Sequence, residues 1–264
     1  MSDRVLVSVE DHVARVRLNR PEKRNGLDLE MFEALAAAAE RVPSEPGVRA
    51  VVLSGEGRAF CAGLDWMAFL GMADRAVPAL LDRRAGEAAN LAQKVSVAWA
   101  MAPVPVIAAV HGAALGGGLQ IALGADLRYV APDAQLSVME VRYGLVPDMG
   151  LSVLLPRLVR ADVARELTFT GRVIDGVEAA RLGLATRVCD DPLAAALETA
   201  RAIAANAPRA VRAAKRLLRD APAHDPAASL ALESELQRAL MGTPEQMEAV
   251  QAAMEKRAGR FDDP

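Results

Sequence analysis

Two glycine-rich turns and two acids are the residues of this chain best suited to chemistry. The turns are residues 61–65 (CAGLD) and 112–118 (GAALGGG), and the acids are Glu140 and Asp148, eight residues apart. Glycine-rich turns leave peptide N–H groups free to point at an anion. Two such turns can hold one oxygen as it gains negative charge, while carboxylates move protons on the neighbouring carbon. This combination is suited to enolate chemistry on a carbonyl compound.

The second turn lies between an apolar segment, residues 104–110, and a short predicted helix that ends near residue 123. This order places free N–H groups at the positive end of a helix. The glycines do not follow the dinucleotide pattern G-x-G-x-x-G, and no Gly-Lys-Ser/Thr closes the turn as in a P-loop. An oxyanion-type donor site fits best, with close helix–strand packing as the alternative reason for the glycines.

The first turn follows another predicted buried strand, a position where α/β proteins bind ligands. The peptide N–H of Leu64 can therefore be the second donor. Cys61 is a poor candidate for a nucleophile, because no histidine is predicted beside it and a small buried cysteine is common.

Short strands that alternate with helices must position these turns. Alternating residues predict a hairpin over 5–9 and 13–18, and apolar runs predict buried strands over 49–54, 104–110 and 126–130. Asp28 can cap a helix that runs to about residue 42, and residues 73–101 are expected to be mostly helical despite Pro78. Strands and helices in this order predict an α/β layered core over residues 1–190.

The composition changes beyond about residue 190. Residues 206–220, 227–241 and 244–257 are rich in Ala, Leu, Glu and Arg and predict helices with no strand between them. We therefore predict a second region, residues 191–264, that serves as an oligomerisation or lid element or else packs on its own core.

Bulk composition excludes several classes of protein. The 264 residues are 52% hydrophobic but only 3% aromatic, so the core must consist of Ala, Val, Leu and Met. A net charge of -3 without a basic block does not fit a nucleic-acid binder. Cys61 and Cys189 have neither metal-ligand spacing nor a disulfide framework. Without an uninterrupted apolar run of about 18 residues, we expect no membrane span and a cytoplasmic location.

Several segments together resemble the crotonase (enoyl-CoA hydratase/isomerase) superfamily over nearly the whole chain. They are residues 19–25, 58–66, 109–118, 167–171 and 180–185, and residues 255–257 with Phe261. The resemblance implies a spiral of ββα units whose helical tail builds a trimer, often paired into a hexamer. It also implies an acyl-CoA thioester as substrate, with coenzyme A as part of that substrate and no metal or redox cofactor.

Residue by residue, the resemblance assigns the oxyanion hole to the N–H groups of Leu64 and Gly117, which would bind the thioester oxygen. The neighbouring residues then contact substrate: Ala62, Gly63, Asp65, Trp66 and Gly116. Lys23 and Arg24 can approach the phosphates of coenzyme A. The apolar residues just past the first turn can line the acyl pocket or face the core: Trp66, Met67, Phe69, Leu70 and Met72.

The acids depart from the simple hydratase pattern. Hydratases use two glutamates around the attacking water; the second matches Glu140, but the first falls on Gln120, which cannot exchange a proton at neutral pH. Asp148 instead matches an acid of the dienoyl-CoA isomerase branch, although that branch has a further Asp at the position of Gln120. Gln120 can still orient a water or the thioester. Arg142 and Tyr143, between the two acids, can face the pocket or the solvent.

These matches favour a double-bond shift by carboxylate proton transfer from Glu140 and Asp148. An enoyl-CoA hydratase that uses Glu140 as acid and base stays open as the alternative. A catalytically weak acyl-CoA-binding protein is a third possibility, and other crotonase chemistries such as thioester hydrolysis complete the set.

Overall fold

A computed structural model describes residues 3–70 and 73–263 and, for residues 73–76, the backbone alone. Its main sheet has six strands in the order β1-β2-β3-β4-β6-β8. The first two strands form the predicted antiparallel hairpin, and the others join them in parallel. The strands are β1 (Val5–Glu10), β2 (Val13–Leu18), β3 (Ala50–Gly55), β4 (Val106–Val110), β6 (Leu127–Val130) and β8 (Arg187–Val188).

A small second sheet includes part of the second glycine-rich turn. Strand β5 (Ala113–Leu115) pairs in parallel with β7 (Gln135–Ser137). An isolated bridge joins Cys61 of the first turn to Ala114 of β5. The first turn is therefore fixed against the segment that leads into the second.

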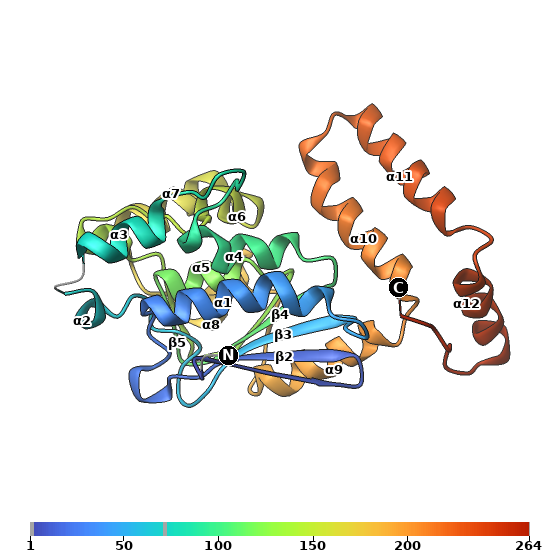
Figure 1. The fold of residues 1–264 in the computed structure, drawn as a ribbon, viewed down its shortest axis with the longest axis horizontal. Coiled ribbons are helices and arrows are strands. Elements are labelled where there is room, and N and C mark those ends of the chain that lie inside the picture. The colour runs from blue at the N-terminus through green and yellow to red at the C-terminus, as the bar shows by residue number, and fades with distance from the viewer. Residues whose placement is uncertain (1–2, 71–72, 264) are drawn as a thin grey trace.

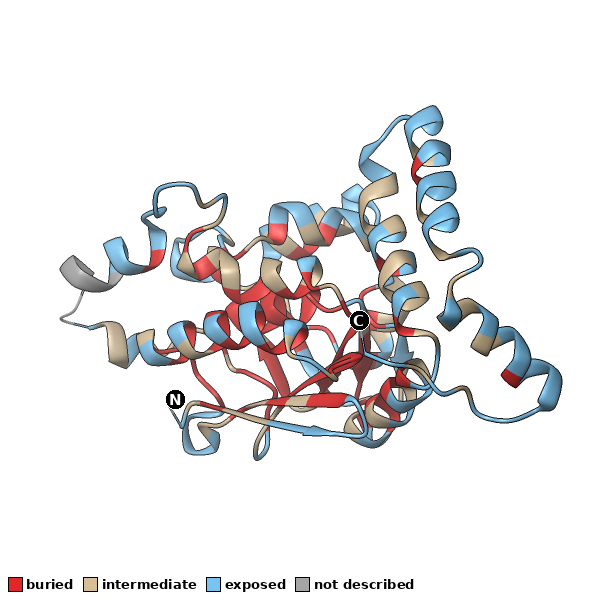
Figure 2. Cartoon of the chain, turned by 45° about the vertical axis from the view of Figure 1, so that its right-hand side comes forward, coloured by how far each residue is buried: buried red, intermediate tan, exposed pale blue. Residues whose placement is uncertain are grey.

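Helices cover both faces of the main sheet. Figure 1 shows α1 (Leu29–Arg41), α4 (Leu91–Met101) and α5 (Gly117–Leu123) on one side of strands β2–β4 and α9 (Pro192–Ala204) on the other. Because alanines form the buried side of α9, this helix can lie close to the sheet. Burial is concentrated in the sheet and these covering helices (Figure 2). The predicted α/β layered class is confirmed.

The predicted first helix is present, with the predicted cap. Asp28 accepts a hydrogen bond from the N–H of Met31 at 2.8 Å, as a side chain at the N-cap does. Met31, Leu35 and Ala38 fall on one side of the helix and are buried. The helix begins at Leu29 and ends at Arg41, one residue before the predicted end.

Residues 73–101 do not form one helix. Helix α3 (Ala73–Leu81) contains Pro78, and residues 82–90 separate it from α4. Asn90 starts α4 through a capping box with Gln93. Ahead of them, Asp65 caps the short helix α2 (Trp66–Phe69). Met72 lies outside the described residues.

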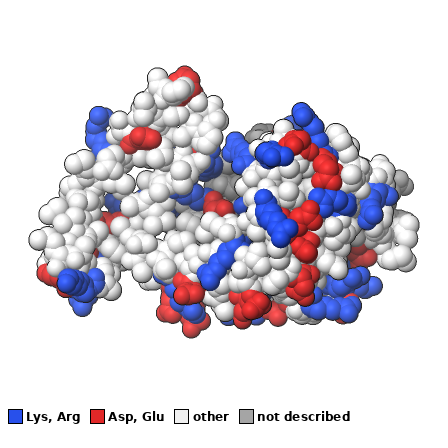
Figure 3. Space-filling view, turned by 180° about the vertical axis from the view of Figure 1, so that it is seen from behind, with Lys and Arg blue, Asp and Glu red and all other residues white. Residues whose placement is uncertain are grey.

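Three short helices, α6 (Leu151–Leu154), α7 (Ala161–Thr170) and α8 (Gly176–Leu182), lead to the C-terminal part. There α10 (Pro208–Asp220), α11 (Pro226–Leu240) and α12 (Pro244–Glu255) agree with the three predicted helices. The ribbon of Figure 1 shows α11 and α12 standing away from the sheet as an arm. On the face seen in Figure 3, much of the arm is uncharged, whereas both signs of charge mix over the rest.

Lys215 anchors α10 to the core. Its Nζ donates to the carbonyl of Val104 at 2.9 Å and forms an ion pair with Asp126 at 2.7 Å. The same Asp126 carboxylate accepts the N–H of Val106 at 2.7 Å. Asp126 is thus a structural anion that joins β4 to α10.

Candidate active site

The predicted site residues meet at one cavity of about 720 Å³ between the two turns, α1 to α4 and the segment 139–149. Nearly all of them line it: Lys23, Arg24, Ala62, Gly63, Leu64, Asp65, Trp66, Gly116, Gly117, Glu140 and Asp148. Gln120 is fully buried and does not line the cavity.

Backbone hydrogen bonds hold the two turns against each other. The N–H of Cys61 donates to the carbonyl of Ala113 at 2.9 Å, and the N–H of Leu115 donates to the carbonyl of Cys61 at 3.1 Å. A Cβ on Gly118 would lie 2.1 Å from the Cys61 oxygen, and one on Gly63 would lie 2.6 Å from the Leu115 oxygen. Only glycine permits this approach, so the close packing of the two turns requires Gly63 and Gly118.

Two amides on the cavity wall are free to bind an anion. Leu27 donates to the carbonyl of Gly63 at 2.8 Å and accepts from the N–H of Asp65 at 2.9 Å, which fixes the peptide between them. The N–H of Leu64 and that of Gly117, the first residue of α5, donate to no acceptor in residues 3–70 and 73–263. A Cβ on Gly63 would lie 3.7 Å from the Gly117 nitrogen, so the two turns are neighbours.

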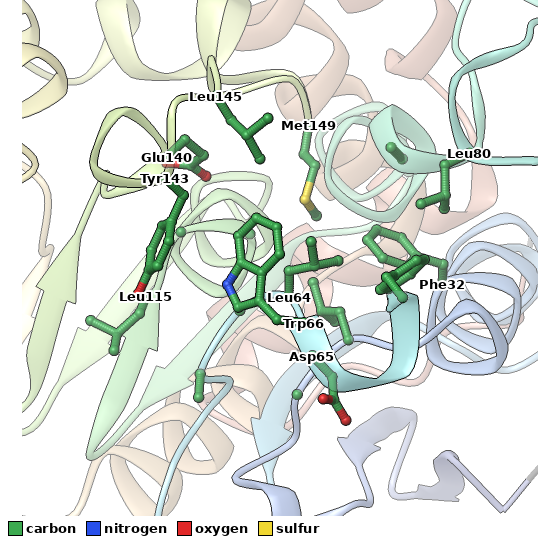
Figure 4. A pocket seen from close by; sticks show the side chains of 18 of the residues that line it. Phe32, Leu64, Asp65, Trp66, Leu80, Leu115, Glu140, Tyr143, Leu145 and Met149 are labelled. Carbon is green, nitrogen blue, oxygen red and sulfur yellow. The ribbon is translucent and has the colours of Figure 1, made fainter. Parts of the chain in front are cut away.

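Asp65 has a structural partner. Arg20 donates to its Oδ2 at 2.7 Å, and its Oδ1 accepts the N–H of Ala68 at the start of α2. In Figure 4 its carboxylate points away from the other labelled side chains. The side chain therefore fixes the end of the first turn, beside the Leu64 amide.

Glu140 begins a 3-10 turn (Glu140–Tyr143) just after β7. Its side chain is buried, and its Oε1 accepts Nε2 of Gln120 at 2.6 Å. Its Oε2 has no hydrogen-bond partner in the described part of the chain. Burial raises the pKa of Glu140 above its usual value, and the charge of Asp148 adds to this. The backbone N–H of Glu140 itself and the side chain of Gln120 act in the opposite direction. A Cβ on Gly116 would lie 3.3 Å from Oε1, so the carboxyl adjoins the second turn.

Asp148 lies in the loop between that 3-10 turn and α6. It keeps exposed surface, yet the protein around it removes enough water to raise the pKa of the carboxyl above its usual value. No side chain in the described ranges donates a hydrogen bond to it. The cavity thus contains two carboxyls with raised pKa values, and of these two Glu140 is the one with a side-chain donor among the described residues.

Gln120 lies behind Glu140. Its Oε1 accepts the N–H of Met149 at 2.9 Å while its Nε2 donates to Glu140, so both ends of the amide are occupied by protein. In this structure the amide therefore contacts the residues that flank the site, and the predicted contact with substrate stays a prediction.

Apolar side chains form the rest of the wall. Trp66 and Tyr143 face each other with ring centroids 5.1 Å apart (Figure 4). The cluster predicted after the first turn lines the cavity through Met67, Phe69 and Leu70 as well. Sequence reasoning missed the residues from other elements, among them Phe32, Leu80, Ala92, Leu145 and Met149. Phe32 fits the core periodicity of α1, so no signal in the sequence distinguishes it from a core residue.

The remaining candidates have simple positions. Lys23 and Arg24 are exposed at the cavity, and Arg24 also borders a second hollow of about 300 Å³ with Arg58. Burial raises the pKa of the Cys61 thiol to about 12, which keeps it an unreactive thiol at neutral pH. Arg142 packs on Gly171 and does not line the cavity.

The described residues contain neither a metal-ligand cluster nor a membrane-spanning helix. Among the described residues, no group of three or more His, Cys, Asp or Glu side chains is arranged to hold a metal ion. In the same residues, no helix combines the length and apolarity needed to cross a membrane.

Comparisons with known proteins agree with this geometry. The family model described as Enoyl-CoA hydratase/isomerase matches residues 8–264. "Probable enoyl-CoA hydratase EchA14" of Mycobacterium tuberculosis is 41% identical over 82% of each chain. The mouse mitochondrial Delta(3,5)-Delta(2,4)-dienoyl-CoA isomerase is 34% identical over 96% of this chain and 79% of its own. The crystal structure of enoyl-CoA hydratase from Bacillus anthracis is 32% identical, covers 98% and 99% of the two chains, and superimposes with a TM-score of 0.88. The chain therefore belongs to the enoyl-CoA hydratase/isomerase (crotonase) family of acyl-CoA enzymes.

Proposed function

We propose that the enzyme moves double bonds along the acyl chain of an unsaturated acyl-CoA. For a 3,5-dienoyl thioester, a base removes a proton from C2 and an acid adds one to C6, so the double bonds move to C2=C3 and C4=C5. The intermediate is a dienolate whose thioester oxygen carries the negative charge. The N–H groups of Leu64 and Gly117 would bind that oxygen, and each such donor contributes about 2.7–4 kcal/mol to the transition state.

The surroundings of the two acids support separate roles. Glu140 adjoins the second turn and hence the thioester end, and it accepts a hydrogen bond that favours its ionised form. It is therefore assigned as the base at C2. No side chain among the described residues donates to Asp148, and its raised pKa favours the protonated form that the distant carbon needs.

The state of Gln120 is the observation that carries this proposal. A carboxamide does not act as an acid or a base at neutral pH, and both ends of the Gln120 amide are bound to protein. Asp65 also lines the cavity, but its carboxylate is bound to Arg20. The carboxyls available for proton transfer in the described cavity wall are thus Glu140 and Asp148. This pair fits a double-bond shift better than the two-glutamate chemistry of a hydratase.

Hydration is the second candidate. The unpartnered Oε2 of Glu140 can hold a water, and relatives named as hydratases match the chain as well as those named as isomerases. In this mechanism Glu140 would act as both acid and base, without a requirement for Asp148.

Steady-state assays on two substrates test the proposal. Conversion of a 3,5-dienoyl-CoA, followed by the absorbance of the conjugated 2,4-dienoyl thioester, should fall about 10²–10⁴-fold in both Glu140→Gln and Asp148→Asn. Binding of the thioester, measured by calorimetry, should persist. The exposed, Arg160-paired Asp162 provides a matched control in Asp162→Asn. Efficient hydration of crotonyl-CoA that needs Glu140 but not Asp148 would overturn the assignment.

We also infer that the arm carries subunit contacts, as the family resemblance implies for a trimer or a dimer of trimers. Leu218, Leu230, Met247 and Met254 are each more than half exposed on α10–α12. Such apolar surface is typical of an interface. Light scattering with sizing would give the mass of the assembly. The boundary at residue 190 and the cytoplasmic location stay predictions.

A further inference from the structure

Gln120 links the two parts of the site that hold the acids. Its Nε2 donates to Oε1 of Glu140 at 2.6 Å, and its Oε1 accepts the N–H of Met149 at 2.9 Å. Met149 directly follows Asp148 in the chain. The Gln120 side chain is completely buried on α5, so neither bond is weakened by exchange with solvent.

The orientation of this amide follows from its partners. The N–H of Met149 can only donate, so it must face the amide oxygen, and the amide nitrogen must then face Glu140. The nitrogen donates to one carboxylate oxygen and leaves the other, Oε2, unpartnered in the described part of the chain. Glu140 therefore retains one oxygen that can accept a proton.

We infer that Gln120 is a positioning residue, which keeps Glu140 ionised as a base and holds the Asp148 loop at a fixed place beside it. It touches no substrate and acts through these two residues. This inference rests on the proposed double-bond shift, since it assumes that Glu140 must be ionised and Asp148 must lie opposite. It gives a glutamine a specific role at a position where a carboxyl would share a proton with Glu140.

Other charged groups around Glu140 are few. Asp148 acts on it electrostatically and opposes its ionisation. Helix α7, which packs on the 3-10 turn of Glu140, contributes Asp162, Arg165 and Glu166. Of these, Asp162 pairs with Arg160 and Glu166 pairs with Arg172 on the surface.

On the 3-10 turn itself, Arg142 lies against Gly171 and Tyr143 stacks on Trp66. Gln120 lies on α5, which packs against α4 and α6. Helices α5 and α6 contain no titratable residue. On α4, Lys94 pairs with Glu40 and Glu87. Gln120 is thus the side chain that donates a hydrogen bond to Glu140 in the described ranges.

Two substitutions at position 120 should move the pH profile in opposite directions. Gln120→Met keeps the volume but removes the donor, so the pKa of Glu140 should rise and the acidic limb of kcat should move up by about one pH unit. In Gln120→Glu, the protonated new carboxyl can make both bonds and donates more strongly to Glu140. The acidic limb should then move down, and a new alkaline limb should appear as both carboxyls ionise.

The steady-state constants kcat and KM should distinguish a positioning role of Gln120 from a direct contact with substrate. Because Gln120 does not line the cavity, kcat of Gln120→Met should fall about tenfold or more, whereas KM should change by less than about threefold. The matched control is Ile121→Val, which removes a methyl from the next, equally buried residue of α5. Its acidic limb should coincide with that of the wild type.

A titration without turnover separates this inference from the proposed function. Carbon-13 NMR of protein labelled at the glutamate carboxyl, with the resonance assigned through Glu140→Gln, gives the pKa of Glu140 directly. If the wild type fails to convert dienoyl-CoA, the proposed function falls, but the titration still decides the role of Gln120. If Gln120→Met does not fold, the opposite shift in Gln120→Glu provides the test. An unchanged Glu140 titration in the folded variants, or activity loss without movement of a limb, would overturn the inference.

Discussion

The substitution Gly118→Ala tests whether catalysis depends on the close contact between the two turns. Gly118 has a negative φ, so alanine introduces no backbone strain there. Its Cβ, however, would lie 2.1 Å from the carbonyl oxygen of Cys61 and 2.9 Å from the Cβ of the same residue. Cβ atoms essentially never lie within 3.0 Å of such atoms. The first turn must therefore move away from the second by about 1 Å, a displacement large enough to impair catalysis.

This movement would separate the Leu64 and Gly117 amides, the two donors of the proposed oxyanion site. The Cys61 carbonyl accepts the N–H of Leu115, so its displacement also disturbs the strand that leads to Gly117. Loss of one effective donor costs about 2.7–4 kcal/mol, or about 10²–10³ in kcat. Overpacking costs a further ~1–3 kcal/mol of stability, which leaves the protein folded if its stability is typical. The assay is kcat and KM on the dienoyl-CoA, with circular dichroism and thermal unfolding on the same preparations.

Gly86→Ala is the control for a general loss of stability. Gly86 lies in the loop before α4 with φ of 82°, and nothing lies within 4 Å of its missing Cβ. Alanine there costs about 1–2 kcal/mol through backbone strain alone and should leave kcat unchanged. The reasoning fails if folded Gly118→Ala retains kcat within threefold of the wild type, because the two turns would then not need their observed separation.

Two further predictions concern stability. Lys215→Met leaves Asp126 unpaired and should lower the free energy of unfolding by about 3 kcal/mol, near the low end for a buried pair because Asp126 reaches solvent; the urea midpoint at pH 7 measures this loss. Burial raises the pKa of folded Glu140 above its unfolded value, so the folded state binds its proton more tightly and loses relative stability as pH rises through the folded pKa. Glu140→Gln should therefore raise Tm at pH 8, by about 2–4 °C per kcal/mol gained, and have little effect near pH 4; an equal change at both pH values would contradict this.

Local signals explain what the sequence predicts well. The cap at Asp28, the alternation over residues 5–18 and the apolar runs before each turn act within a few residues, and the structure contains the corresponding helix, hairpin and strands. The glycines of the two turns are also visible in the sequence, because close backbone approach demands them whatever the ligand. The resemblance to a family adds the prediction that the amides of Leu64 and Gly117 bind the ligand.

Several features were missed, and most of them depend on distant contacts. The break between α3 and α4 follows from the Asn90 capping box, a local signal that the alanine-rich surroundings obscured. Phe32 and Leu80 line the cavity because α1 and α3 approach the first turn, and spacing along one helix cannot reveal this. The partners of Gln120 come from segments 20 and 29 residues away, so its place behind Glu140 needs the folded chain.

The division of labour in this site explains how one fold can hold different reactions. The proposed oxyanion donors belong to the backbone, and their positions depend on glycines whose replacement would separate the turns. The side chains at positions 120, 140 and 148 are free of that constraint, and under the proposed function those at 140 and 148 decide which carbons lose or gain a proton. Hydration needs a water held between two carboxyls, and the occupied Gln120 amide offers no second carboxyl beside Glu140. Asp148 lines the same cavity instead, so under the proposed function an acyl chain bound between the two acids would lose a proton at one carbon and gain one at another.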